Sequence, residues 1–360
     1  PAMKITDIKA GKGPQELTVP FRVAFAEINY SENLLLKVST DEGIDGYGEA
    51  APMPFVTGET IDSVISVINM IRPGLIGMDP MDIEKIHELM DTCIYGNSSA
   101  KCAVDLAVYD LMGKFMGQPV YKLLGGYSNR VQNDITIGIS TPELMAEEAR
   151  QHVLKDGFHI LKIKAGINVE EDIRAMRLIR ETGAQHPPRV DANQGYSASD
   201  AVYAIQELKN AGIEAGNNAS PHWDFEGSAY VRSKVSGIRI MLDESIHNHL
   251  DAARACKKRL CRYPEHQTHE MRRPFPCFSD QFHRRSLRSN LHGWLHDGDQ
   301  TRYHRRSKPR CRQEKIITEA DCDSFLFYAD EQTGMTGGFI RDNDIFTLLD
   351  APGFGLDLSF

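Results

Sequence analysis

Residues 161–166 read Leu-Lys-Ile-Lys-Ala-Gly, and residues 190–194 read Val-Asp-Ala-Asn-Gln. Side chains along a β-strand alternate between its two faces, so Lys162 and Lys164 share one face and the apolar residues share the other. The aspartate and the asparagine of the second stretch repeat this pattern. Two solvated surface strands are the alternative, which the flanking apolar residues disfavour. Burying such charges is costly unless they compensate one another, so the pattern predicts two neighbouring strands whose charged groups act together.

An alternation of strands and helices continues on both sides of these stretches. Strand-like runs at 134–139, 158–164, 189–193 and 238–243 are followed by helical patterns at 141–154, 169–182, 197–211 and 248–258. Four β/α units of this length indicate an α/β fold with a parallel-stranded barrel. Functional groups of such barrels gather at the carboxyl ends of the strands, where Lys164, Asp191 and Asp243 would lie.

The N-terminal third has a different order, with strands before helices. Strand-like runs at 4–10, 21–30 and 33–39 precede helical periodicity at 60–93 and 98–116. We expect an α+β domain over residues 1–126, with lid loops near 18–30 and 51–60. The barrel would occupy residues 127–325, and residues 326–360 would return to the α+β domain.

The bulk composition limits the possible partners. The chain is 41% hydrophobic and 25% charged, as in ordinary globular proteins, and its formal net charge of -9 argues against a nucleic-acid partner. There is no apolar run of about 18 residues and no signal-peptide pattern, so we expect no membrane association. Seven cysteines without a CxxC pair indicate reduced thiols in a cytoplasmic protein.

Six short motifs occur in order along the chain. They are Gly48-Glu49-Ala50, Tyr109-Asp110-Leu111 with Leu123-Leu124-Gly125-Gly126, Lys162-Ile163-Lys164, Asp191-Ala192-Asn193-Gln194, Asp243-Glu244-Ser245 and Asp321-Cys322-Asp323. Together they resemble the enolase superfamily, in its muconate-lactonizing subgroup, and most of all its dipeptide epimerases. The resemblance covers residues 3–261 and 316–360. It implies a modified (β/α)7β-type barrel of the enolase type, with the α+β domain of residues 1–126 as its capping domain.

The resemblance implies a Mg²⁺-dependent isomerase that removes the proton next to a dipeptide carboxylate, through an enediolate intermediate. Asp191 and Asp243 match the first and third metal ligands of the family, with Asn193 and Glu244 beside them. Asn217, 26 residues from each aspartate, stands at the second ligand, which is a Glu in the family. Mg²⁺ prefers oxygen ligands and would stabilise the negative charge that develops on the substrate carboxylate.

The resemblance also assigns the acid/base and substrate-binding groups. Lys164 matches the base, and Lys162 would help to bind the substrate carboxylate. A facing lysine is implied near residues 267–268, where this chain reads Gln-Thr. Asp321 and Asp323, which alternate on one strand face, match the pair that binds the dipeptide ammonium. That pair favours a dipeptide epimerase over the alternatives, a muconate cycloisomerase or an o-succinylbenzoate synthase.

The side chain at the second position of the dipeptide is also constrained. Family members that act on Ala-Glu place an Arg where this chain has Ala26. We therefore expect an apolar or uncharged second side chain. We further expect a homo-oligomer whose partner is the small-molecule substrate.

Residues 262–313 break every pattern described so far. Between Arg259 and Arg312 the chain has 12 Arg and 6 His in 54 residues, without regular apolar periodicity. Back-translating residues 265–273 and reading one nucleotide later gives Asn-Ile-Lys-Leu-Met-Lys-Cys-Gly, the family pattern around the facing lysine. We interpret this segment, and a few residues near 217, as out-of-frame translation. The alternatives are a genuine basic loop and, if the sequence stands as written, a catalytically impaired or non-enzymatic protein.

Overall fold

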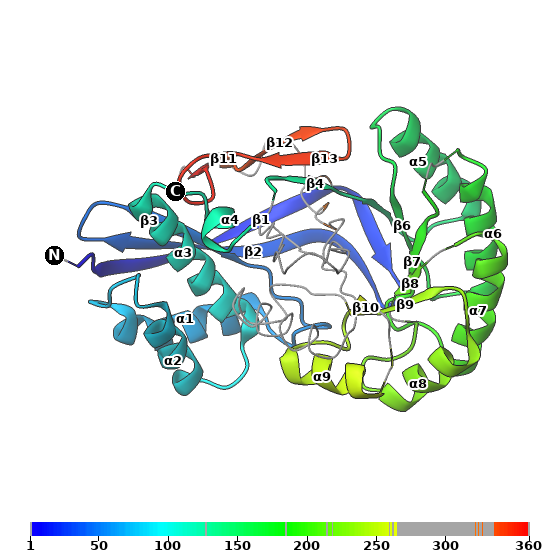
Figure 1. Cartoon of the computed structure of the whole chain (residues 1–360), viewed down its shortest axis with the longest axis horizontal. Helices are drawn as coiled ribbons and strands as arrows, with labels where there is room; N and C mark the ends of the chain where they lie inside the picture. The colour runs from blue at the N-terminus through cyan, green and yellow to red at the C-terminus, as the bar shows by residue number, and fades with distance from the viewer. Residues whose placement is uncertain are drawn as a thin grey trace, which may run out of the picture.

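The chain folds into an N-terminal unit of antiparallel strands and helices, beside an arc of parallel strands that is covered by helices (Figure 1). The computed structural model describes residues 2–126, 128–183, 186–213, 215–217, 219–258, 260, 263–264, 321, 323, 326 and 335–358. Among these residues, no helix is both long and apolar enough to cross a membrane. The domain boundaries expected at residues 126 and 325 remain predictions.

The N-terminal unit packs helices against one face of a three-stranded sheet. The strands are β1 (Ile5–Val23), β2 (Ala26–Thr40) and β3 (Asp45–Ala50), and the helices are α1 (Ile61–Leu75), α2 (Ile83–Cys93), α3 (Ser98–Met116) and α4 (Val120–Leu123). Apolar side chains from β1, β2 and α1 to α3 form one buried core. Helix α3 lies so close to β3 that a Cβ at Gly48 would be 1.9 Å from the carbonyl oxygen of Ala103. Glycine is therefore required at this position of the sheet.

Strands β1 and β2 form a long hairpin that reaches from this unit to the barrel strands (Figure 1). Residues 18–30, expected as a lid loop, instead form the end of this hairpin, with Ala24 and Phe25 in its turn. The hairpin contains Pro14 and Pro20, which lack the N–H that a strand donates. Pro14 lies within the paired residues of β1, which is an edge strand of the three-stranded sheet, and Pro20 lies where the pairing shifts register between Glu16 and Phe21.

Parallel strands alternate with helices in the second unit. The strands are β5 (Ile135–Ile137), β6 (Leu161–Lys164), β7 (Arg189–Asp191), β8 (Ala215–Asn217), β9 (Arg239–Leu242) and β10 (Tyr263–Pro264), and the helices are α5 (Pro142–Leu154), α6 (Val169–Arg180), α7 (Ala198–Asn210), α8 (Phe225–Lys234) and α9 (His249–Lys258). The six strands lie side by side in chain order, and the helices form an outer arc around them (Figure 1).

The expected starts of two barrel helices are confirmed by their capping contacts. Thr141 Oγ1 accepts a hydrogen bond from Leu144 N, and Pro142 occupies the first turn of α5, where its missing N–H costs nothing. At α9, Asn248 Oδ1 accepts from Leu250 N at 2.8 Å. Both caps satisfy backbone donors that a helix N-terminus leaves unpaired.

A second apolar core lies between the barrel strands and their helices. Leu161, Ile163 and Val190 are buried in it. Because successive strand residues point to opposite faces, this places Lys162 and Lys164 on the inner face of the arc. The strand faces predicted from the alternation are therefore confirmed.

The C-terminal residues pair with both units. The strands concerned are β4 (Arg130–Gln132), β11 (Met335–Gly337), β12 (Phe339–Asp342), β13 (Ile345–Leu348) and β14 (Leu356–Leu358). Strand β13 lies between β12 and β4, and β11 pairs with β14. Between β13 and β14, Phe354 N donates to Asp110 Oδ1 at 2.8 Å, and Tyr47 N donates to Asp110 Oδ2 at 3.0 Å. The buried Asp110 thus joins the C-terminal segment to α3 and β3.

Candidate active site

The carboxyl ends of neighbouring strands bring the predicted residues into one row. Lys164 at the end of β6 pairs in register with Asp191 at the end of β7, and Asp191 pairs with Asn217 at the end of β8. Asp243 directly follows the end of β9, the next strand. The in-register pairing therefore places Lys164, Asp191 and Asn217 side by side. Asp243 lies at the end of the next strand.

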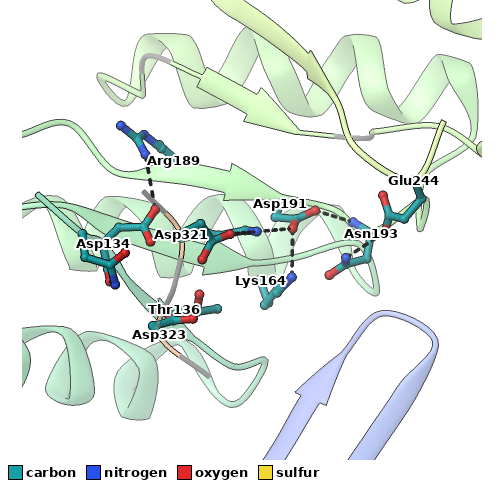
Figure 2. Close-up of polar contacts among 11 residues, drawn as sticks. Asp134, Thr136, Lys164, Arg189, Asp191, Asn193, Glu244, Asp321 and Asp323 are labelled. Carbon is teal, nitrogen blue, oxygen red and sulfur yellow. Dashed lines mark hydrogen bonds and ion pairs between the residues drawn. The ribbon is translucent and has the colours of Figure 1, made fainter. Parts of the chain in front are cut away.

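Lys162 and Lys164 converge on one carboxylate oxygen. Lys164 Nζ donates to Asp191 Oδ2 at 2.8 Å, and Lys162 Nζ lies 3.0 Å from the same oxygen (Figure 2). Lys162 also donates to Asp321 Oδ2 at 2.6 Å. The lysines expose 3% and 9% of their surface and Asp191 exposes none. The predicted cooperation of two buried lysines with one carboxylate is confirmed.

The charge state of Asp191 follows from this contact. Burial alone would raise the pKa of its carboxyl, but Lys164 and Lys162 outweigh burial and hold the pKa below its usual range. The backbone N–H of Asn193 also donates to Asp191 Oδ1 at 3.0 Å. Asp191 is therefore a fixed negative charge at the end of β7.

Asn193 connects this carboxylate to a second acidic pair. Its side-chain Nδ2 donates to Glu244 Oε1 at 3.0 Å (Figure 2). The backbone of Asn193 is left-handed, with φ of 39°, which a short polar side chain tolerates better than most. This conformation lets the backbone N–H of Asn193 bond Asp191 while its amide group bonds Glu244. Asn193 and Glu244 thus lie beside Asp191, and their roles in the site remain predictions.

The donor set at these strand ends fits a hard divalent cation. Asp191 and Asp243 offer buried carboxylate oxygens, the ligand type that Mg²⁺ prefers. Burial, and then the neighbouring Glu244 carboxylate, raise the pKa of Asp243 well above its usual range; the Asp191 carboxylate adds to this rise, and Lys162 and Lys164 only oppose it. Carboxylates are thus gathered at these strand ends, and a cation between Asp191 and Asp243 would offset their mutual repulsion.

Two predicted positions are only partly covered by the structure. The backbone of Asn217 completes β8 beside Asp191, but its side chain lies outside the described residues. The facing lysine expected near residues 267–268, and the segment 262–313 interpreted as out of frame, lie outside them too, apart from strand β10. The ligand role of Asn217 and the existence of the facing lysine remain predictions.

A second carboxylate group lies toward the amino ends of the strands. Oxygens of Asp134, Asp321 and Asp323 lie within 4.8 Å of one another, close enough to share a cation. Asp323 Oδ2 accepts from the backbone N–H of Thr136 at 2.6 Å, which holds it against β5 (Figure 2). Asp321 and Asp323 are thus brought together as predicted, and both are buried.

Asp134 and Arg189 were not singled out from the sequence. Arg189 Nη1 donates to Asp134 Oδ2 at 3.3 Å, and Asp134 is fully buried (Figure 2). Burial and the Asp321 carboxylate raise the pKa of Asp134, and the Arg189 guanidinium opposes that rise. The signal that could have found Arg189 is the strand period of two, because Arg189 shares the inner face of β7 with Asp191.

The tip of the β1–β2 hairpin contacts the barrel directly beyond β6 and β5. Ile139 N donates to the carbonyl of Arg22 at 2.8 Å. A Cβ on Gly166 would lie 3.1 Å from Ala24 Cβ and 2.2 Å from a neighbouring carbonyl oxygen, so only glycine allows this approach. Phe25 in the hairpin turn also meets Phe55 of the connection 51–60, with ring centroids 5.9 Å apart.

Comparison with known families and proteins agrees with this architecture. Residues 5–125 match the mandelate racemase/muconate lactonizing enzyme N-terminal domain, and residues 144–271 match the enolase C-terminal domain-like family. The chain is 41% identical over 257 residues to a hydrophobic dipeptide epimerase of Enterococcus faecalis, covering 71% of this chain and 72% of that protein. It is also 41% identical over 263 residues to an L-Ala-D/L-Glu epimerase of Clostridium acetobutylicum, covering 72% and 73%.

A solved structure extends the similarity to the whole fold. The crystal structure of the dipeptide epimerase from Enterococcus faecalis V583, complexed with Mg and the dipeptide L-Leu-L-Tyr, matches with a TM-score of 0.89 and 32% sequence identity. The match covers 98% of this chain and 99% of that one. The fold class expected from the sequence, a barrel of the enolase type with a capping domain, is therefore confirmed.

Proposed function

This chain belongs to the mandelate racemase/muconate lactonizing enzyme family of the enolase superfamily, and we propose that it is an isomerase that epimerises dipeptides with Mg²⁺. The observation that carries the proposal is the convergence of Lys162 and Lys164 on Asp191 at buried strand ends. Both curated relatives named above act on dipeptides, and the similar structure holds Mg and a dipeptide.

The proposed chemistry begins with proton removal by Lys164. Its Nζ is the more exposed of the two lysine groups and hydrogen-bonds only the carboxylate at the end of β7 among the contacts described above. As the base, Lys164 takes the proton from the carbon next to the substrate carboxylate, and the electron pair of the broken C–H bond moves toward that carboxylate. Lys162, held between Asp191 and Asp321, adds fixed positive charge beside it.

Asp191 and Asp243 would hold Mg²⁺, with the third ligand at position 217. The metal, when bound, stabilises the negative charge that develops on the substrate carboxylate oxygens. Asn193 and Glu244 orient this pair, because Asn193 donates to both Asp191 and Glu244. Supporting hydrogen bonds of this kind fix the ligands before the metal binds.

Epimerisation also needs a proton donor on the opposite face of the substrate. The facing lysine near residues 267–268 would supply it, if the segment is read in the frame interpreted above. With Lys164 alone, the proton would return from the face that it left, and the α-carbon would exchange without inversion.

The buried carboxylates of Asp321 and Asp323 support a substrate with a free ammonium group. An ammonium group that reaches these carboxylates would form charge-assisted hydrogen bonds with them, which are the stronger kind. Muconate and o-succinylbenzoate-type substrates carry no cation, so this pair favours the dipeptide. The proposal is therefore specific about the amino end of the substrate.

The hairpin tip supports an apolar side chain on the second residue of the dipeptide. The turn consists of Ala24 and Phe25, and Phe25 packs with Phe55. Neither contributes a cation that would pair with a glutamate side chain, and Ala26 stands where relatives acting on Ala-Glu carry an Arg. Replacing Ala26 by Arg is expected to raise the relative kcat/KM for L-Ala-L-Glu over L-Ala-L-Phe.

The proposal is tested by incubating the protein with a panel of dipeptides in D₂O with Mg²⁺. We expect deuterium to enter the second residue with inversion of its configuration. NMR measures the deuterium, and chiral chromatography measures the inversion. Exchange without inversion would indicate one working lysine. No exchange and no Mg²⁺ binding would favour a non-enzymatic protein. The homo-oligomeric state and the cytoplasmic location remain predictions.

A further inference from the structure

Asp172, in the first turn of α6, is a buried carboxylate that the proposed chemistry does not use. One of its oxygens, Oδ2, accepts the backbone N–H of Gly166 at 3.0 Å and the hydroxyl of Tyr196 at 2.7 Å. Burial, and then the Asp172 carboxylate, raise the pKa of the Tyr196 hydroxyl, so this hydroxyl keeps its proton and acts as the donor. A single carboxylate oxygen therefore joins two segments that are distant in the sequence.

These two segments are the loops that directly follow β6 and β7. Gly166 comes two residues after Lys164, the proposed base, and Tyr196 comes three residues after Asn193. The loops touch each other, because a Cβ on Gly195 would lie 2.2 Å from the carbonyl oxygen of Gly166. Glycine at both points allows this approach but does not restrict the backbone as other residues would. The hydrogen bonds to Asp172 supply that restriction.

The loop after β7 contains two consecutive residues with positive φ, Asn193 at 39° and Gln194 at 66°. Residues other than glycine rarely adopt this conformation, which persists only where the surrounding structure holds it. It directs the N–H of Asn193 to Asp191 Oδ1, which orients this carboxylate (Figure 2). Tyr196, at the end of the same turn, is held by its hydroxyl bond to Asp172 and by a backbone hydrogen bond to the loop after β8.

We propose that Asp172 is a positioning residue that, through the Tyr196 hydroxyl, holds the loop after β7 against the loop after β6 and so fixes the Asp191 carboxylate relative to Lys164. The inference rests on the proposed function, because it takes Asp191 as a Mg²⁺ ligand and Lys164 as the base. Asp172 and Tyr196 act through the backbone of the two loops. Ligands and bases that are held in place before binding lose little freedom when the metal and the substrate arrive.

Tyr196→Phe removes the hydroxyl alone. The ring stays, and it packs in the core between the barrel strands and their helices. The N–H of Gly166 keeps its bond to Asp172, so no buried backbone donor is left unpaired. The turn that contains Asn193 is then held less firmly, and Mg²⁺ binding must restore the arrangement of Asp191. Part of the metal affinity is lost in doing so.

Helix α6 offers a matched control contact. The hydroxyl of Tyr203, in α7, donates to Glu170 Oε1, in α6, at 2.9 Å. This is the same kind of bond, from a tyrosine hydroxyl to a carboxylate of the first turn of α6, but it lies at the exposed surface. Tyr203→Phe therefore removes an equivalent hydrogen bond and leaves the loops after β6 and β7 as they are.

The test measures Mg²⁺ binding by calorimetry without substrate, and α-proton exchange of a dipeptide by NMR in D₂O. We expect Tyr196→Phe to weaken Mg²⁺ binding by about tenfold and to lower kcat for exchange at saturating Mg²⁺ by about tenfold, with KM changed by less than about threefold. Tyr203→Phe is expected to stay within about twofold of the unaltered protein in both measurements. Circular dichroism and urea unfolding check that each variant is folded.

A double-mutant cycle tests whether Asp172 and Tyr196 act through one contact. Asp172→Asn weakens the acceptor but keeps the size of the side chain, and it is expected to lose more Mg²⁺ affinity than Tyr203→Phe. Adding Tyr196→Phe to it is expected to cost less affinity than Tyr196→Phe costs in the unaltered protein, because the shared bond is already weakened. If Tyr196→Phe is unfolded, the comparison of Asp172→Asn with Tyr203→Phe decides the question.

Three results would overturn the inference. The first is a folded Tyr196→Phe, or in its place Asp172→Asn, that binds Mg²⁺ and exchanges the α-proton within about twofold of the unaltered protein. The second is an equal loss in Tyr203→Phe, and the third is full additivity in the cycle. If the unaltered protein neither binds Mg²⁺ nor exchanges the α-proton, the proposed function fails and the inference falls with it. An unaltered protein that does both, with variants that miss the expected pattern, refutes the inference alone.

Discussion

Replacing each of the two strand lysines by methionine separates proton transfer from structural support. Asp191 accepts a hydrogen bond from Lys164 Nζ. It also contacts Lys162 Nζ and the Asn193 N–H, each at 3.0 Å, so these two partners remain when Lys164 is replaced. One charged hydrogen bond is lost, which lowers the free energy of unfolding by about 1.5–3 kcal/mol. The loss of a general base lowers the rate of α-proton exchange by about 10² to 10⁴-fold.

Lys162→Met is expected to lower the stability more, and the exchange rate less, than Lys164→Met does. Lys162 lies 2.6 Å from Asp321 Oδ2 and 3.0 Å from Asp191 Oδ2, and all three groups are buried. Its removal leaves Asp321 without this cation and Asp191 with one lysine, so the free energy of unfolding falls by about 3–5 kcal/mol. Lys164 remains in place as base, and exchange is reduced less than in Lys164→Met.

Two measurements check this pair of variants. Urea unfolding without Mg²⁺ gives the free energies, and NMR in D₂O with Mg²⁺ gives the exchange rate for a dipeptide that the unaltered protein epimerises. The reasoning is refuted if Lys164→Met exchanges the α-proton as fast as the unaltered protein. A Lys162→Met protein that is no less stable than Lys164→Met would equally contradict the contacts assigned to Lys162.

Three further predictions concern Mg²⁺ binding, His152 and the coding DNA of residues 262–313. Mg²⁺ at about 100 times its Kd is expected to stabilise the protein by about 2.7 kcal/mol, and Asp243→Asn to lose most of the accompanying rise in Tm; an unchanged rise would exclude Asp243 as a ligand. Burial lowers the pKa of His152, but hydrogen bonds to Glu148 and Asp156 outweigh it and leave the pKa raised. The resulting stability is present below the unfolded pKa of about 6.5 and lost as pH rises through the folded pKa, so urea titrations should show His152→Gln destabilising in acid and not in alkali. Sequencing the coding DNA is expected to show that residues 262–313 follow a shifted frame; codons in frame throughout would remove that interpretation.

The positions of Lys162, Lys164, Asp191 and Asp243 were predictable because they follow from a short-range sequence pattern. Lys162 and Lys164 are two residues apart on a strand with buried alternate residues, and Asp191 and Asp243 end strands at the spacing of β/α units. In-register parallel pairing then brings Lys164 beside Asp191 without any further information. A local period and a regular topology are enough for this part of the site.

The contacts of Asp134 and the path of the hairpin were not predictable in the same way. Asp134 meets residues more than fifty positions away, and the preceding sequence gives no sign of the ion pair. Strand β1 continues through Pro14 and Pro20, since it is an edge strand and its pairing shifts register beside Pro20. Edge position is a property of the finished sheet and is absent from the local sequence.

Asp110 links residues that are made early in synthesis to residues that are made late. Its carboxylate receives the N–H of Tyr47 within the N-terminal unit and the N–H of Phe354 from a point 244 residues later. Strand β4 likewise obtains its partner, β13, only after more than two hundred further residues have been made. The Phe354 contact and the β4–β13 pairing therefore form only after almost the whole chain has been made, and a reading frame that is not restored before this segment would remove both.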